Sequence, residues 1–146
     1  MKRIALIFVS MLLCGCANRQ LYELGLAAAE GDLNKVAQLI DKGVNVNGCV
    51  GYEGCVRPLE IAAREGYLEI VKYLVEHGAK INTQNESGNA VFVAALFGRA
   101  DITHYLLSKG GRLICSESSF KWLIDNMMKS EKKELATEVA KTWIAP

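Results

Sequence analysis

Apolar residues recur at helical spacing in three similar stretches of the chain. In the second stretch, Val71, Leu74 and Val75 stand at positions i, i+3 and i+4, which places them on one face of a helix. Each stretch contains an alanine pair, which lets two helices approach closely, and a glycine three residues after the pair. A second glycine, twelve residues later, is placed to end the next helix in the left-handed conformation. The pattern predicts pairs of short helices in residues 24–47, 59–82 and 92–114, with their glycines at Gly31 and Gly43, Gly66 and Gly78, and Gly98 and Gly110.

The end of the chain carries a fourth helix pair of altered sequence. Helical patterns cover residues 120–128 and 131–143, and Met127-Met128 replaces the alanine pair. Terminal units of a repeat stack are expected to be atypical, because they seal its core against water. We therefore expect Trp122 and Trp143 to seal the core rather than to contact a partner.

The repeating pattern resembles the ankyrin repeat, whose period is about 33 residues. The sequence RPLEIAA at residues 57–63 corresponds to the family's Thr-Pro-Leu-His-x-Ala-Ala string, with Arg57 in place of threonine and Glu60 in place of histidine. The resemblance implies an all-α fold: an ankyrin-repeat solenoid of about four helix-turn-helix units with short hairpin loops, the last unit being a capping repeat. The expected repeats are residues 21–50, 51–83, 84–115 and 116–146, which together form one domain over 21–146.

The N-terminus has the pattern of a signal peptide. Lys2 and Arg3 precede ten residues, 4–13, whose only polar member is Ser10. A helix that crosses a membrane needs about 20 apolar residues, so this run is too short to span one, and it has the length of the apolar region of a signal peptide. A buried N-terminal helix is the alternative.

The next residues, Leu13-Cys14-Gly15-Cys16, resemble the bacterial lipobox. The resemblance implies removal of residues 1–15, lipidation of Cys16 and a short tether over residues 16–20. Ala17, rather than an aspartate, after the cysteine favours the outer membrane of a Gram-negative cell, with the domain facing the periplasm. An ordinary cleavage that leaves a soluble protein is the alternative.

Two further cysteines, Cys49 and Cys55, lie in a glycine-rich loop and could form half a zinc site, a redox pair or a disulfide. A zinc site needs more ligands at suitable spacing, and the two histidines, His77 and His104, stand far along the chain. A redox pair usually has two intervening residues, whereas this pair has five. Thiols in an oxidising envelope tend to pair, which favours a Cys49–Cys55 disulfide. Cys115 is left as a buried apolar residue.

Charge and motifs argue against several classes of function. The formal net charge is +1, and the loss of Lys2 and Arg3 with residues 1–15 would make it −1. Such a chain has no electrostatic reason to bind nucleic acid. We find no catalytic motif, no cofactor motif and no metal-spaced cluster in the sequence. We therefore expect a binding module that is not an enzyme and carries no cofactor.

The resemblance also implies where a partner would bind. In the ankyrin family the partner contacts include the two residues after the alanine pair and the tips of the hairpin loops, which together form a concave face. Leu96-Phe97 stands out, because the position is usually polar. Phe97 could equally pack against the fourth unit. The residues expected to contact a partner are Tyr52, Glu53, Arg57, Arg64, Glu65, Glu86, Asn89, Leu96 and Phe97.

These expectations combine into a membrane-anchored, periplasm-facing module that binds, scaffolds or inhibits another envelope protein. An alternative is an immunity protein that neutralises an antibacterial effector, for example a phospholipase, at the membrane. The expected partner is a protein on the concave face, and the membrane is contacted through the lipid.

Overall fold

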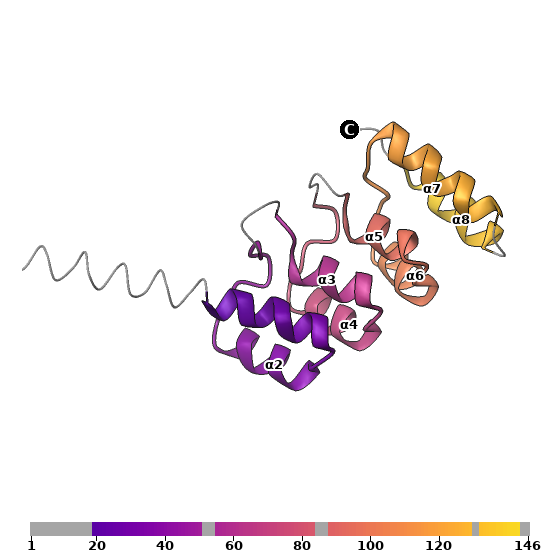
Figure 1. The fold of residues 1–146 in the computed structure, drawn as a ribbon. Helices are drawn as coiled ribbons and strands as arrows, with labels where there is room; N and C mark the ends of the chain where they lie inside the picture. The colour runs from indigo at the N-terminus through magenta and orange to yellow at the C-terminus, as the bar shows by residue number, and fades with distance from the viewer. Residues whose placement is uncertain (1–18, 51–54, 84–87, 130–131, 144–146) are drawn as a thin grey trace, which may run out of the picture.

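The computed structural model describes residues 19–50, 55–83, 88–129 and 132–143. The described chain forms helix pairs stacked side by side, with the N-terminal pair at one end and the C-terminal pair at the other (Figure 1). Within these residues the extended structure is limited to an isolated antiparallel bridge between Val50 and Val56. The predicted all-α fold is confirmed. The pairs are residues 19–30 with α2 (Leu33–Asp41), α3 (Pro58–Glu65) with α4 (Leu68–Glu76), α5 (Ala90–Leu96) with α6 (Ala100–Ser108), and α7 (Glu117–Lys129) with α8 (Lys133–Lys141).

The alanine pairs lie at the centre of the stack. All six alanines are at most 3% exposed, and the backbones of α3 and α5 approach closely. Each second helix contributes a valine or threonine and a leucine that are fully or almost fully buried, for example Val71 and Leu74 in α4. Because the core lies between neighbouring pairs, each repeat depends on the next for its burial. None of the helices in the described residues is long and apolar enough to span a membrane.

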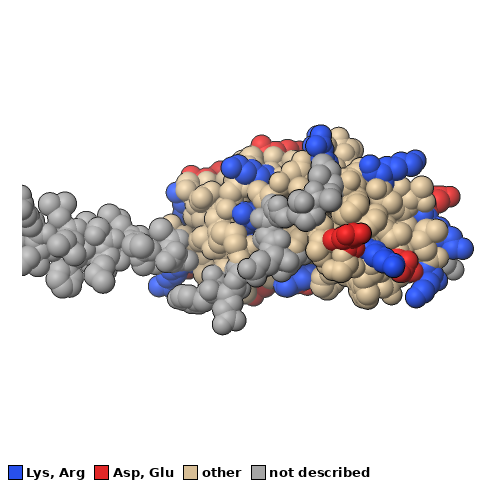
Figure 2. All heavy atoms as spheres, turned by 90° about the horizontal axis from the view of Figure 1, so that it is seen from above, with Lys and Arg blue, Asp and Glu red and all other residues tan. Residues whose placement is uncertain are grey.

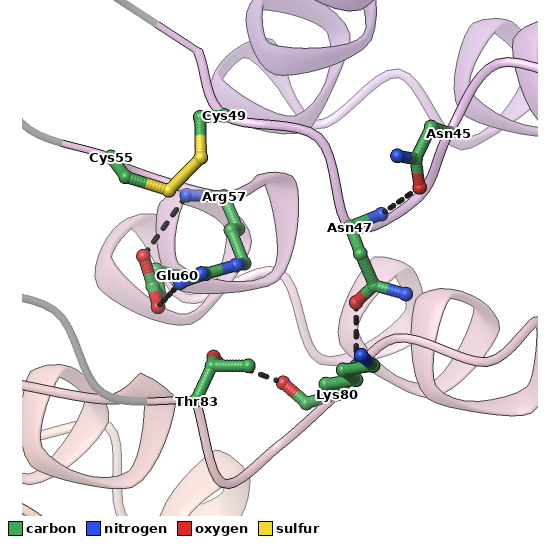
Figure 3. The surroundings of a disulfide bond; sticks show 8 residues. All are labelled: Asn45, Asn47, Cys49, Cys55, Arg57, Glu60, Lys80 and Thr83. Carbon is green, nitrogen blue, oxygen red and sulfur yellow. Dashed lines mark hydrogen bonds and ion pairs between the residues drawn. A yellow bond between two sulfur atoms is a disulfide. The ribbon is translucent and has the colours of Figure 1, made fainter.

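Two asparagines join the first three repeats, one at each junction between neighbouring units. The Asn47 side chain donates to the Gly78 carbonyl at 3.0 Å and accepts from the Lys80 amide at 2.8 Å, as Figure 3 shows for the second bond. Asn82 repeats the arrangement one unit later, where it donates to the Gly110 carbonyl and accepts from the Arg112 amide. We call this pair of bonds the asparagine clamp. Ile114 stands at the corresponding place after the third repeat, so the clamp is not repeated there.

Side chains of one repeat also cover the turn glycines of the repeat before it. Gly31 has a φ of +81° and lies under the ring of Tyr67. Gly66 lies under the guanidinium of Arg99, whose Nε donates to the Arg64 carbonyl at 3.0 Å. These contacts fix the spacing of the repeats at the ends of the first helices.

The fourth unit is attached differently. Met127 is buried where the earlier units have the first alanine of the pair, and α7 does not approach α5 as closely as α5 approaches α3. The Trp143 ring stacks on Phe120 with centroids 4.3 Å apart, and its Nε1 donates to the Cys115 carbonyl at 3.4 Å. The prediction that Trp143 seals the core is therefore confirmed.

The same prediction for Trp122 is wrong, because that side chain is 56% exposed. Met128, expected in the place of a buried alanine, is 46% exposed. On α7 the buried positions, Leu123 and Met127, are one turn apart, so Trp122 and Met128 fall on other faces of the helix. The bulky residues of this unit thus remain partly at the surface.

Candidate functional site

Most of the exposed large apolar side chains lie on the first helices of the pairs. Among the described residues, two others are exposed outside these helices, Leu33 on α2 and Tyr67 before α4. Scattered single apolar residues are ordinary on a protein surface, but a concentration on one set of helices marks an interaction surface. The side chains on or directly after the first helices, with their exposed fractions, are Tyr22 (61%), Leu26 (45%), Leu96 (37%), Phe97 (51%), Trp122 (56%) and Met128 (46%).

A shallow apolar hollow of about 350 Å³ lies between α5 and α7. Its lining residues are Phe92, Leu96, Ser118, Ser119 and Trp122. The hollow exists because α7 carries larger buried side chains than the alanine pairs and does not close against α5. The hydroxyls of Ser118 and Ser119 provide polar atoms at its edge, and both contact the Ser116 hydroxyl. A hollow with apolar walls and a few hydrogen-bonding groups can accept an apolar side chain.

Phe97 and Leu96 lie where the sequence placed them, after the alanine pair at the end of α5. Phe97 is the C-cap residue of α5 and half of its surface is exposed, so the alternative that it packs in the core of the fourth unit is not supported. Leu96 lines the hollow directly. We call Leu96, Phe97 and Trp122 the apolar patch.

Arg64 and Glu65 occupy the same position in the second repeat. The Arg64 Nε lies 2.8 Å from the Glu65 Oε1, and both side chains are partly exposed. An exposed ion pair of this kind contributes little to stability, so both groups are available to a partner.

The Arg57 side chain is less exposed than expected for a partner contact. Its side chain is 17% exposed and its Nη1 lies 3.4 Å from the Glu60 Oε1. Glu60 also accepts from the Arg57 amide at 2.9 Å, which caps the start of α3 (Figure 3). Arg57 and Glu60 therefore cap the start of α3 at the positions where the family pattern has threonine and histidine.

The prediction for Asn89 is wrong. This residue is fully buried and is the N-cap of α5, accepting from the Phe92 amide at 3.1 Å. Its amide group donates to the Arg112 carbonyl at 2.6 Å, so its hydrogen bonds are used inside the protein. The remaining predicted contacts, Tyr52, Glu53 and Glu86, and the predicted lipidation site Cys16 lie outside the described residues.

Cys49 and Cys55 are joined in a disulfide, as predicted, with their Cα atoms 4.8 Å apart (Figure 3). Next to the bond, the Val50 amide donates to the Val56 carbonyl at 2.8 Å. Val50 packs on Gly25, where a Cβ atom would lie 2.9 Å from its methyl groups. The disulfide thus lies next to a residue, Val50, that packs on the first helix of the stack.

Cys115 is the free cysteine of the described residues, and it is buried. Burial raises the pKa of its thiol, which keeps it protonated and unreactive. The described residues include no cluster of three or more histidine, cysteine, aspartate or glutamate side chains that could hold a metal ion.

Charged groups do not form a field of one sign on the face seen in Figure 2. Lysine and arginine side chains are interspersed with acidic ones there, and much of the surface is formed by other residues. Strong nucleic-acid binding requires a basic patch, so this face lacks its main electrostatic requirement.

Trp122 was missed as a surface residue, and so was its role in the hollow. The signal that could have found it is the spacing on α7: Leu123 and Met127 share a face, and Trp122 is next to that face rather than on it. The hollow itself depends on how far α7 stands from α5, which the sequence does not encode in any short motif.

A family model for ankyrin repeats in three copies matches the chain over residues 7–85 and again over 24–118. The chain belongs to the ankyrin-repeat family. The family's helix pairs, turn glycines and alanine pairs are those described above.

Several known proteins contain similar ankyrin segments. The chain is 26% identical over 82% of its length to a transient receptor potential cation channel subfamily A member 1 homolog of Caenorhabditis elegans. It is 35% identical over 47% of its length to the 2-5A-dependent ribonuclease of Mus musculus, and 34% identical over 56% to the E3 ubiquitin-protein ligase XBAT33 of Arabidopsis thaliana. The chain spans only 10%, 9% and 16% of these proteins. Because their names describe three different activities, the similarity extends to the ankyrin repeats and indicates no shared activity.

Proposed function

We propose that this ankyrin-repeat chain is a lipid-anchored module that faces the periplasm and binds another protein of the bacterial envelope. Family membership supports binding of a protein partner, because stacked repeats present an extended surface for this purpose. The lipid anchor at Cys16 and the envelope location rest on the lipobox-like sequence at residues 13–16. The proposal gives the chain no catalytic role.

The apolar patch is the observation that carries the choice of binding surface. Phe97 and Trp122 are both more than half exposed, and Leu96 and Trp122 line the hollow. Large aromatic side chains provide most of the energy of protein interfaces when a partner buries them. Arg64 and Glu65 would form the polar rim of that interface.

A photo-crosslinking residue at position 97 tests the binding surface in cells. The matched control carries the same residue at position 101, because Asp101 is exposed on α6, a second helix. We expect position 97 to crosslink one envelope protein that position 101 does not capture. Equal products at both positions, or none at position 97, would contradict the proposed surface.

The anchor is tested separately by Cys16→Ser. We expect the unchanged protein to fractionate with outer membranes and to carry the mass of three acyl chains, and the variant to lose both properties. A soluble, unmodified wild-type protein would contradict the anchor. The binding surface does not depend on this result, because the crosslinking experiment tests it separately.

The activity of the captured partner distinguishes the two forms of the proposal. A scaffold leaves a partner enzyme active or protects it, whereas an immunity protein inhibits an incoming effector. Assays of the partner with and without an equimolar amount of this chain separate the two outcomes.

A further inference from the structure

The fourth unit places a large side chain at a position that is small in the three repeats before it. Met127 on α7 stands where these repeats have the first alanine of the pair, Ala27, Ala62 or Ala94. Met127 is 4% exposed, whereas Met128, the second member of its pair, is 46% exposed. Met127 is therefore the member that packs inside the protein, and it extends beyond the methyl group that the earlier repeats have there.

The distance between α5 and α7 depends on the side chains that are packed between them. Packed helices lie about 8–10 Å apart from axis to axis, according to the size of the side chains at the contact. The helices α3 and α5 each carry an alanine pair, and they approach each other closely. The helix α7 carries Met127 in place of the alanine and does not approach α5 to the same extent. The apolar hollow of about 350 Å³ lies in the space that remains between α5 and α7.

The walls of the hollow would close on each other if no buried group kept them apart. Leu96 and Trp122 both line the hollow, and 37% and 56% of their surfaces are exposed. A movement of α7 towards α5 would cover part of this apolar surface, which is favourable in water. The open hollow therefore indicates a steric obstacle between the two helices, and Met127 is in the position to provide it.

The junction between the third repeat and the fourth unit can adjust to such an obstacle. Ile114 stands where the first two repeats have the asparagine of the clamp, so the described residues form no asparagine clamp at this junction. His104 on α6 and Glu138 on α8 are in contact at 3.0 Å and join the second helices. Because this contact lies between α6 and α8, the distance between α5 and α7 is left to the side chains packed between those two helices.

We propose that Met127 is the spacer that holds the hollow open, and thereby a positioning residue of the binding surface. Met127 is buried and acts through Leu96 and Trp122, the exposed walls that it keeps apart. The size of the side chain at position 127 then determines the size of the apolar side chain that the hollow accepts from the partner. This last step rests on the proposed function, whereas the spacing of α5 and α7 does not.

The first test measures the exposure of Trp122 in the purified full chain. Tryptophan is replaced by fluorotryptophan, and the fluorine resonance of Trp122 is identified by its loss in Trp122→Phe. The shift of this resonance between light and heavy water reports contact of the ring with solvent. We expect Met127→Ala to reduce the shift about twofold, because α7 closes on α5. Met127→Leu should keep the wild-type value, since leucine is nearly as large as methionine.

The second test follows the partner in cells, with the photo-crosslinking residue at position 97. We expect Met127→Ala to lower the yield of the crosslinked envelope protein about tenfold at equal amounts of folded chain, and Met127→Leu to retain it. The matched control in both tests is Leu135→Ala, because Leu135 is 5% exposed on α8 of the same unit and its truncation also removes buried side-chain volume. This control should leave both the exposure of Trp122 and the crosslinking unchanged, so a general loss of stability is distinguished from the loss of the spacer.

Each contrary result has its own meaning. If Trp122 remains as exposed in Met127→Ala as in the wild type, α7 does not close and Met127 is not the spacer. If Trp122 becomes buried while crosslinking persists, Met127 sets the helix spacing but does not position the binding surface. If the wild type gives no crosslink at position 97, the proposed binding surface fails, and the fluorine measurement still decides the role of Met127. Should Met127→Ala not fold, Met127→Val must reduce the exposure of Trp122 in its place, and an unchanged value there refutes the spacer.

Discussion

At the scale of single residues, the contact between Gly31 and Tyr67 sets the position of the second repeat. Gly31 and Gly43 have φ angles of +81° and +82°, so an alanine at either place meets the same backbone strain. A Cβ atom on Gly31 would lie 2.6 Å from the Tyr67 ring, whereas one on Gly43 would meet nothing within 4 Å. The two glycines are therefore a matched pair that separates backbone strain from packing.

We predict that Gly43→Ala lowers the free energy of unfolding by about 1–2 kcal/mol, the cost of a left-handed alanine. Gly31→Ala should cost more, because Tyr67 must also move. Urea denaturation measures both values. The excess for Gly31→Ala should disappear in a Tyr67→Ala background, as a double-mutant cycle requires; if the excess persists there, Tyr67 is not its cause.

A second prediction concerns the asparagine clamp. Asn82→Ala removes two hydrogen bonds to the next repeat and should lower the free energy of unfolding by about 1 kcal/mol, since water replaces part of the loss. Asn34→Ala is the control, because Asn34 is exposed on α2 and makes none of these bonds. Equal effects of the two changes in thermal or urea denaturation would show that the clamp contributes nothing.

Residue identity predicted the helices better than it predicted exposure. The alanine pairs and turn glycines recur at a fixed spacing, because close helix packing and left-handed turns require small residues there. Both could therefore be predicted from the sequence. Asn89 was misassigned because a repeat template places it at a loop tip, whereas its side chain is the N-cap of α5. Trp122 was misassigned because size alone suggested burial.

At the scale of elements, the Cys49–Cys55 disulfide joins the end of the first repeat to the start of the second. Beside it, Val50 packs on Gly25 in the helix over residues 19–30. The pairing could be predicted from the sequence because the signal-like N-terminus indicated an oxidising compartment. The packing of Val50 next to the disulfide could not be predicted, because it depends on Gly25 in the facing helix.

We predict that replacing both Cys49 and Cys55 by serine lowers the free energy of unfolding by about 2 kcal/mol, the loop-closure estimate for a ring this small. Cys115→Ser keeps the disulfide and serves as the control. Chain unfolded without reductant, after loss of residues 1–15 and lipidation of Cys16, should titrate with one free thiol. Three free thiols would mean that the disulfide does not form in the cell.

The two tryptophans of the fourth unit give a further prediction. Trp143→Ala removes the stacking on Phe120 and should cost about 2 kcal/mol, below the range for a fully buried aromatic residue because Trp143 is half-buried. Trp122→Ala should leave stability almost unchanged, because its side chain is exposed. Denaturation followed by circular dichroism measures the stability of both variants. A larger loss for Trp122→Ala than for Trp143→Ala would show that α7 buries Trp122, contrary to the structure.

At the scale of the whole molecule, the stack offers a long surface whose apolar part lies at α5 and α7. Once crosslinking has identified the partner, Phe97→Ala should weaken binding by about 2 kcal/mol or more if Phe97 is a hot spot. Leu33→Ala, at the opposite end of the stack, is the control. Calorimetry measures both affinities, and a folded Phe97→Ala protein with unchanged affinity would remove the apolar patch from the interface.

The missing asparagine clamp after the third repeat has a mechanical consequence. Hydrogen bonds from the Asn47 and Asn82 side chains to backbone groups join the first three units, whereas α7 and α8 are held to α6 and its loop by fewer contacts, among them His104 with Glu138 at 3.0 Å. Tension on the two ends of the chain should therefore peel off the last helix pair first, releasing about 30 residues, or roughly 100 Å of extended chain. The remaining repeats would yield at higher force, and the segment closed by Cys49 and Cys55 would not lengthen at all.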